Sequence, residues 1–101
     1  DAAHAFGSTL DKKLIGSFGD INCFSFDGIK NITSGEGGCI VSKDTELLTS
    51  IMDDRLLGVV RDSDFLYARS RSLEFDVLKP GRRYHMSDIN AAIGISQLML
   101  K

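Results

Sequence analysis

Lys30 is the residue of this chain whose surroundings best suit covalent chemistry. It lies in a polar loop that follows a strand-like run ending at Phe26 and precedes a second apolar run starting at Gly38. Loops at the ends of strands are frequent ligand sites in α/β proteins. Partial removal of a lysine from water favours its neutral amine, and a neutral amine can attack a carbonyl to form a Schiff base. The alternative for any single lysine is a solvated surface charge.

Three more residues carry groups that could act with such an amine. Asp1 and His4 open the chain in the segment DAAHAFG, and Ser25 precedes Lys30 by five residues. An aspartate and a histidine three positions apart also occur in turns and helix caps, so this pair alone does not indicate catalysis. The sequence holds neither a Walker A motif nor GxGxxG after a strand, so the common nucleotide-binding fingerprints do not apply.

Two other features leave alternatives open. The glycines of GEGG at 35–38 either permit positive backbone dihedrals ahead of a strand or let the backbone approach a ligand closely. Five of the twelve basic residues fall within fifteen positions: Arg69, Arg71, Lys79, Arg82 and Arg83. This group is either a solvated loop balanced by Glu74 and Asp76, or a patch for phosphate or carboxylate groups, which arginine binds through two parallel hydrogen bonds.

The composition restricts the class of protein. The chain has 101 residues, 43% apolar and 26% charged, which fits one small globular domain. No apolar run approaches the roughly 18 residues of a membrane span, and no signal-peptide pattern occurs at the start. The net charge of −2 argues against a general nucleic-acid binder. Because the chain starts without Met and stops inside an amphipathic pattern at Lys101, we expect a piece of a larger protein.

Cys23 and Cys39 are the only cysteines, and their spacing matches neither a CxxC redox motif nor a four-ligand zinc set. Both lie in apolar, strand-like runs. We therefore expect two reduced, buried thiols in a cytoplasmic protein and no metal site. A disulfide across neighbouring strands is the alternative.

Two predicted strands position the candidate residues. Residues 20–26 (DINCFSF) alternate as a strand, with Phe24 and Phe26 on the face opposite Cys23. Residues 38–43 (GCIVSK) form the second strand. The eleven residues between them are polar, rich in glycine and without a helical period, so the two strands should run antiparallel.

Two helices are predicted. The first covers residues 44–57, where large apolar residues recur at helical spacing, and Gly58 ends it. The second covers residues 87–101 and is capped by Ser87. Its apolar stripe comprises Ile89, Ala92, Ile93, Ser96 and Leu100. Residues 59–80 are assigned no element. Two strands and two helices make a poor independent core, so we expect the rest of the protein to cover their apolar side chains.

Four segments together indicate a family: DAAHAFGS, GSFGDINCFSF, KNITSGEGG and YHMSDINAAIG. In order and spacing they resemble the nucleotide-sugar aminotransferases of the DegT/DnrJ type, which depend on pyridoxal 5′-phosphate (PLP) and belong to the fold-type I, aspartate aminotransferase superfamily. The resemblance covers nearly the whole chain and implies an α/β fold. Residues 1–101 would form part of the large PLP-binding domain, with its earlier strands and the C-terminal small domain outside this chain.

The resemblance implies a role for each candidate residue. Lys30 falls on the lysine that holds PLP as a Schiff base and later moves the proton between the two reacting carbons. Asp1 falls on the carboxylate that keeps the pyridine nitrogen protonated, so that the ring accepts electrons. His4 falls on a position that lies against the cofactor ring. Ser25 falls on a serine that binds the cofactor phosphate.

Two positions depart from the family pattern. The family commonly has an asparagine that reaches the phosphate of the neighbouring subunit's PLP, and this chain reads GRRYHM there, so Arg83 takes the asparagine position and His85 that of an arginine. Arginine can still bind phosphate. Asp27 stands where histidine is more usual, which bears on how the sugar is received.

The resemblance implies an enzyme that moves an amino group from glutamate to a keto group of a nucleotide-linked sugar. It also implies a cytoplasmic homodimer with shared active sites, without nucleic-acid or membrane partners. A dehydration-type PLP enzyme and a non-catalytic regulatory homologue are the alternatives. Relatives of the dehydratase kind replace the lysine with histidine, so Lys30 favours transamination. The isolated chain is predicted to be inactive.

Overall fold

The computed structural model describes residues 1–60 and 76–100. The chain divides into two compact units. Unit 1 comprises Asp1–Asp44 and Met86–Lys101, and unit 2 comprises Thr45–His85.

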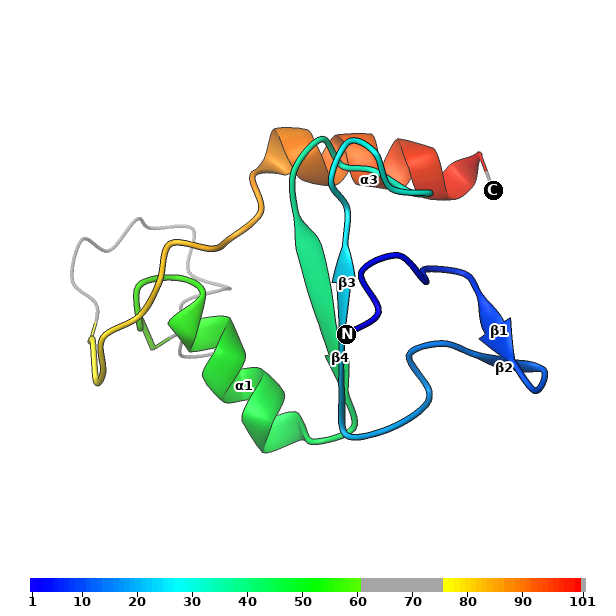
Figure 1. Cartoon of the computed structure of the whole chain (residues 1–101). Helices are drawn as coiled ribbons and strands as arrows, with labels where there is room; N and C mark the ends of the chain where they lie inside the picture. Colours follow the sequence, from blue (N-terminus) through cyan, green and yellow to red (C-terminus); the bar gives the residue numbers. More distant parts are fainter. Residues whose placement is uncertain (61–75, 101) are drawn as a thin grey trace. The chain divides into compact units, whose positions relative to one another are not determined.

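Unit 1 is built on an antiparallel pair of strands, as predicted. Strand β3 (Ile21–Ser25) pairs with β4 (Gly38–Ser42), from Ile21 opposite Ser42 to Ser25 opposite Gly38 (Figure 1). The loop between the strands folds back on itself, because the Ser34 N–H donates to the Phe26 carbonyl at 2.9 Å. Both strands are slightly shorter than predicted, and the loop begins immediately after Ser25.

One face of β3 carries the core of unit 1. Phe24 is buried, together with Ala2 and Ile32. The ring of Phe6 packs edge-on against Phe24 and Phe26, with centroids 5.5 Å apart in both pairs. This confirms the predicted placement of the two phenylalanines on one side of the strand. The short N-terminal segment is thereby held against β3.

A small hairpin precedes β3 and was not expected from the sequence. Its strands are β1 (Thr9–Leu10) and β2 (Lys13–Leu14), paired antiparallel. The two residues of the turn, Asp11 and Lys12, both have positive φ, 49° and 63°. Turns of this kind usually carry glycine or asparagine, and Asp-Lys gives no such signal.

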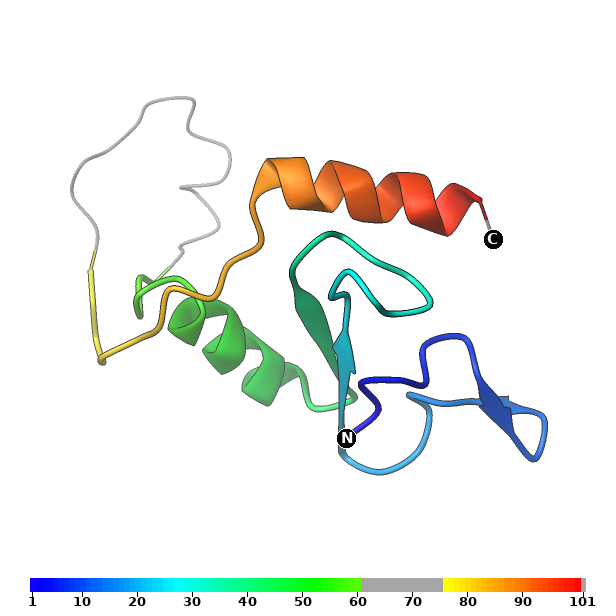
Figure 2. The same ribbon diagram turned by 45° about the horizontal axis from the view of Figure 1, so that its top comes forward.

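Helix α3 (Asp88–Met99) begins as predicted and ends two residues earlier than predicted. Ser87 caps it, because its hydroxyl accepts the Asn90 N–H at 3.2 Å. Asn90 in turn donates its side-chain amide to the Glu36 carbonyl at 3.0 Å. The helix therefore lies along the loop that joins β3 and β4, as Figure 2 shows.

The apolar stripe predicted for α3 does not pack against the rest of unit 1. Ile89 and Leu100 are 75% and 81% exposed. The helix instead approaches the loop through Gly94, where an added Cβ would lie 3.3 Å from the Cβ of Ser34. Small residues allow close approach, and the helix is apolar on several sides, so the periodicity did not identify the packed face.

Unit 2 contains α1 (Thr45–Asp54), which is shorter than the predicted 44–57. The chain leaves the helix through Leu57 and Gly58, both at positive φ, and the Gly58 N–H donates to the Asp53 carbonyl at 2.9 Å. Leu56 then forms an isolated bridge with Arg83 instead of continuing the helix. The prediction that Gly58 ends the helix is therefore wrong, because α1 ends at Asp54 and the left-handed conformation starts at Leu57.

The two cysteines are free, so the disulfide alternative is wrong. Cys23 pairs with Ile40 and Cys39 with Phe24, which directs the two thiols to opposite faces of the ribbon. The expected burial is wrong for Cys23, which is exposed, and Cys39 is half-buried. Burial, with a smaller contribution from Cys23, raises the pKa of the Cys39 thiol above its usual range.

Candidate active site

Asp1 lies beside the middle of β3. The N–H of the next residue, Ala2, donates to the Cys23 carbonyl at 2.9 Å and so fixes the start of the chain against the strand (Figure 1). The Asp1 carboxylate accepts the Ala3 N–H at 2.9 Å and remains exposed. One carboxylate oxygen is therefore held by the backbone.

Lys30 and His4 meet, although 26 residues separate them. The Lys30 Nζ lies 3.0 Å from the His4 Nε2. Lys30 is half-buried and His4 is exposed. The Lys30 N–H donates to the Asp27 carbonyl at 3.0 Å, which closes a turn and brings the lysine back toward the N-terminal segment. The pair thus joins an amine and an imidazole in one hydrogen-bonded contact.

Ser25 is the last residue of β3 and is half-buried. Its hydroxyl oxygen accepts the Asp27 N–H at 3.3 Å. The Asp27 carboxylate accepts the Ile29 N–H at 3.3 Å. Because the Ser25 oxygen serves as an acceptor on the loop side, its own O–H remains available to donate to another acceptor. This suits a hydroxyl that donates to an anion at the end of the strand.

Arg83 belongs to unit 2, where it is exposed. The N–H of the next residue, Tyr84, donates to the Arg55 carbonyl at 2.8 Å. Of the other basic residues, Lys79 forms an ion pair, in which its Nζ lies 3.0 Å from the Asp54 carboxylate. Arg69 and Arg71 lie outside the described residues.

The glycines of GEGG have structural roles, because Gly35 and Gly37 have positive φ and Gly38 lies against backbone. Gly37 has φ +141°, and an added Cβ would lie 2.6 Å from the Met86 Cε. A Cβ on Gly38 would lie 2.5 Å from the Phe24 carbonyl oxygen. These contacts support the structural interpretation of the segment over a close approach to a ligand. The neighbouring Ser34 is 1% exposed, and its hydroxyl donates to the Glu36 carbonyl at 2.8 Å.

Sequence reasoning missed Asn31, which follows Lys30. Its side-chain amide donates to the Phe6 carbonyl. The bond therefore joins the loop of Lys30 to the segment of His4. Its acceptor is a backbone carbonyl, which no residue type marks in a sequence.

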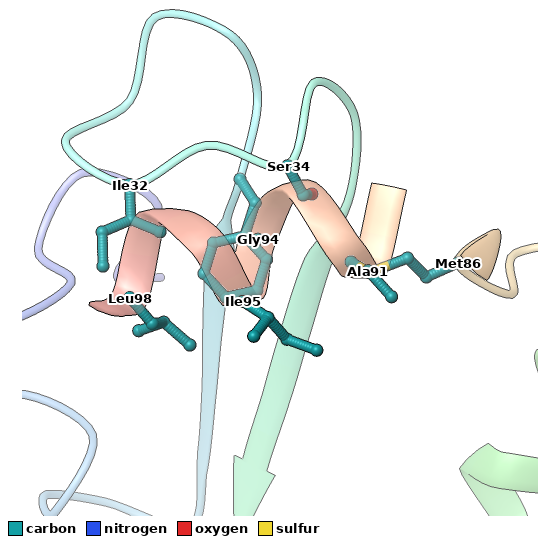
Figure 3. Close-up of a pocket in the computed structure, with 8 residues that line it drawn as sticks. Ile32, Ser34, Met86, Ala91, Gly94, Ile95 and Leu98 are labelled. Atoms are coloured by element: carbon teal, nitrogen blue, oxygen red, sulfur yellow. The ribbon is translucent and has the colours of Figure 1, made fainter. Parts of the chain in front are cut away.

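An apolar pocket of about 220 Å³ lies between α3 and the loop after β3 (Figure 3). Ala91, Ile95 and Leu98 line it from the helix, and Ile32 and Ser34 from the loop. None of the candidate residues lines this pocket, so it is distinct from the site around Lys30.

The candidate residues of unit 1 fit PLP by the chemistry of their groups. A carboxylate at Asp1 suits a protonated ring nitrogen, an amine at Lys30 suits an aldehyde, and a hydroxyl at Ser25 suits a phosphate. The observed contact of Lys30 with His4 brings the amine to the residue expected to lie against the ring. No group of three or more histidine, cysteine or acidic residues in the described ranges could hold a metal ion. Within those ranges, no helix has the length and apolar character to cross a membrane.

Known proteins that match this chain include PLP-dependent aminotransferases. Residues 1–100 match the model of the DegT/DnrJ/EryC1/StrS aminotransferase family. The chain is 43% identical to the uncharacterized protein MJ1066 of Methanocaldococcus jannaschii over 98 residues, which are 97% of this chain and 25% of that protein. It is 39% identical to a UDP-4-amino-4,6-dideoxy-N-acetyl-beta-L-altrosamine transaminase of Campylobacter jejuni, over 97% of this chain and 24% of that protein.

Solved aminotransferase structures share the fold. Helicobacter pylori PseC, an aminotransferase of pseudaminic acid biosynthesis, matches with a TM-score of 0.84 and 33% identity, over 98% of this chain and 24% of PseC. The PMP-form of the sugar aminotransferase Spr1654 of Streptococcus pneumoniae matches with a TM-score of 0.84 and 33% identity, over 98% of this chain and 26% of that one. A PLP-form of the same protein also matches, which agrees with the PLP dependence of these aminotransferases.

The chain spans about a quarter of the length of these relatives. Within that quarter the order of elements agrees with fold-type I aminotransferases, as expected from the sequence. The match of the family model extends over all but the last residue of the chain. The chain therefore belongs to the DegT/DnrJ/EryC1/StrS aminotransferase family.

Proposed function

We propose that the protein containing this chain is an aminotransferase that moves an amino group from glutamate to a keto group of a nucleotide-linked sugar. The observation that carries the proposal is the 3.0 Å contact between Lys30 Nζ and His4 Nε2. It joins two groups from distant parts of the sequence, in a chain that belongs to an aminotransferase family. The relatives from C. jejuni and H. pylori, described as acting in sugar metabolism, support a sugar substrate.

Bound PLP would supply an aldehyde that takes up the amino group and a ring that accepts electrons. Lys30 would hold it by a Schiff base at Nζ and afterwards accept and return a proton at the same atom. Asp1 would keep the ring nitrogen protonated through its negative charge, and His4 would lie against the ring. Ser25 would donate its free O–H to the phosphate.

Arg83 would bind the phosphate of the cofactor held by a neighbouring subunit, so that two copies share each active site. A guanidinium group offers a phosphate two parallel donors and a positive charge, whereas the asparagine common at this position offers a neutral amide. This assignment makes the protein a homodimer. The proposed assembly works in the cytoplasm, with neither nucleic acid nor membrane as a partner.

The proposal is tested first at Lys30. The intact protein is loaded with PLP, reduced with borohydride and mapped by mass spectrometry. The wild type should carry the label on Lys30, and Lys30→Ala should carry none. Lys13→Ala is the matched control, because Lys13 is an exposed lysine of unit 1 in β2 and should leave the label on Lys30. A label on another lysine in the wild type contradicts the assignment.

The second test concerns the reaction. Glutamate should bleach the visible absorbance of the lysine-bound cofactor as the pyridoxamine form appears. The amino group should then pass to a nucleotide-linked keto-sugar more efficiently than to the free keto-sugar. A protein that binds PLP but transfers nitrogen from no amino donor would support the dehydration-type or regulatory alternatives instead.

A further inference from the structure

We propose that Asn31 is a positioning residue, which sets the contact between Lys30 and His4 by tying their two segments together. The inference rests on the proposed function in one respect only, that Lys30 is the residue that binds the cofactor. It adds a residue that the four sequence segments did not single out for any role.

The hydrogen bond of Asn31 to Phe6 is formed one residue from Lys30 and two residues from His4. The side-chain amide of Asn31 donates to the carbonyl oxygen of Phe6. Lys30 and His4 are joined by their own contact at 3.0 Å. The two bonds therefore bridge the same pair of segments side by side, and each restricts the other.

The Phe6 carbonyl, which accepts this hydrogen bond, belongs to a residue that is itself held in place. The ring of Phe6 packs against Phe24 and Phe26, which belong to β3 and to the residue directly after it. Upstream, the Ala2 N–H holds the same segment to β3 through the Cys23 carbonyl. Asn31 thus attaches the loop that carries Lys30 to the N-terminal segment, which β3 already holds at two places.

The loop needs such an attachment. Between Ser25 and Lys30 the backbone is shaped by local bonds, in which Asp27 takes part through its N–H, its carbonyl and its carboxylate. These bonds set the form of the turn but not its distance from His4. Lysine also has a long, flexible side chain, so its amine stays near one partner only if the backbone is held. The long-range bond of Asn31 supplies that restraint.

A second asparagine provides a matched control. The Asn22 side-chain amide donates to the Phe18 carbonyl at 2.7 Å and to the Gly16 carbonyl at 3.3 Å. It is also a carboxamide that holds a loop by backbone carbonyls, but it acts at the beginning of β3, while Lys30 follows the end of that strand. Loss of Asn22 removes two such hydrogen bonds and loss of Asn31 removes one, yet only the loss of Asn31 should change the reactivity of Lys30.

The experiment measures the reactivity of the Lys30 amine in the cofactor-free intact protein. Wild type, Asn31→Ala, Asn31→Asp, Asn31→Gln and Asn22→Ala are acetylated with limiting acetic anhydride over a range of pH. Mass spectrometry then gives the rate at Lys30 relative to the exposed Lys13. A purely structural role of Asn31 would not move this pH profile.

We expect Asn31→Ala to raise the relative rate at Lys30 about two- to tenfold at neutral pH, because one lost hydrogen bond releases the amine from His4. Asn31→Asp should behave like Asn31→Ala, since it keeps the shape of the side chain but has no N–H to donate to the Phe6 carbonyl. Asn31→Gln should recover part of the wild-type profile because it keeps the donor. Asn22→Ala should leave the profile unchanged.

The proposal is overturned if Asn31→Ala and Asn31→Asp leave the Lys30 profile as Asn22→Ala does. If Asn31→Ala does not fold, the isosteric Asn31→Asp decides alone. Borohydride mapping of the PLP-loaded wild type separates this result from the proposed function. A wild type without label on Lys30 removes the role in cofactor binding, whereas the acetylation profile reports the coupling of Asn31 to Lys30 in either case.

Discussion

The hydrogen-bond partners of Ser25 leave its hydroxyl proton available to a ligand. The Ser25 oxygen accepts the Asp27 N–H at the end of β3, where the loop that carries Lys30 begins. A serine has one donor and two acceptor sites, so one acceptor is used by the loop and the donor remains available. A phosphate, which only accepts hydrogen bonds, is the complementary partner.

We therefore expect Ser25→Ala to weaken binding of PLP more than binding of pyridoxal, which lacks the phosphate. A hydrogen bond to a charged group is worth about 1.5–3 kcal/mol, or roughly 10- to 150-fold in dissociation constant. Fluorescence titration of the cofactor-free intact protein with both compounds measures the difference. Ser42→Ala is the control, because Ser42 donates to the Asp20 carbonyl at the opposite end of β3. Equal losses for the two compounds would argue against phosphate binding by Ser25.

The candidate residues were predictable from sequence to different degrees. Lys30 and His4 were singled out from the sequence through the family resemblance, and the structure places their side chains in contact. Asn31 was not predictable, because its partner is the backbone carbonyl of Phe6 and the bond spans 25 residues. The role of Arg83 remains a prediction, since its proposed partner is a phosphate on another subunit.

Among the elements, the strand pair was the most predictable and the packing of α3 the least. The polar link between β3 and β4 was too short and irregular for a crossover helix, so the antiparallel arrangement followed from the sequence. Helix α3 was recognised from its cap at Ser87, but its packed face was not. That face is defined by the small residue Gly94 against Ser34, and hydrophobic periodicity does not detect small residues.

The close pairing of β3 and β4 gives a prediction for Gly38. A Cβ at this position would lie 2.5 Å from the Phe24 carbonyl oxygen, so the end of the strand pair would have to separate. Overpacking of this kind costs about 1–3 kcal/mol. Gly38→Ala should therefore lower the urea midpoint of the intact protein. It should also weaken PLP binding, because Gly38 pairs with Ser25.

Gly28→Ala is the control for this prediction. Gly28 belongs to the same connecting loop, and the nearest atom to an added Cβ is the Gly35 carbonyl oxygen at 4.0 Å. Its free energy of unfolding should stay within about 0.5 kcal/mol of the wild type. If Gly28→Ala and Gly38→Ala shift the urea midpoint equally, the overlap with the Phe24 carbonyl is not the cause.

At the scale of the whole molecule, this chain buries few of its apolar side chains. In the described ranges the buried apolar residues are Ala2, Phe24 and Ile32. Large apolar side chains remain exposed on the strand pair and on α3, among them Ile21, Ile40, Ile89, Ile95 and Met99. A domain with so little burial has little to offset the entropy of its chain. Its relatives are about four times as long, and we expect the remainder of the intact protein to cover these side chains.

This gives a prediction for the 101-residue chain on its own. It should unfold in urea over a broad range, with a small dependence of stability on urea concentration, because little surface becomes newly exposed. It should also show no transamination, since the proposed site combines Lys30 of one copy with Arg83 of a neighbouring copy, and a displacement of about 1 Å can cost roughly a hundredfold in rate. The measurements are circular dichroism during a urea titration and conversion of added PLP with glutamate, with the intact protein as the control. A sharp unfolding transition together with measurable turnover would show that these residues form an independent catalytic unit.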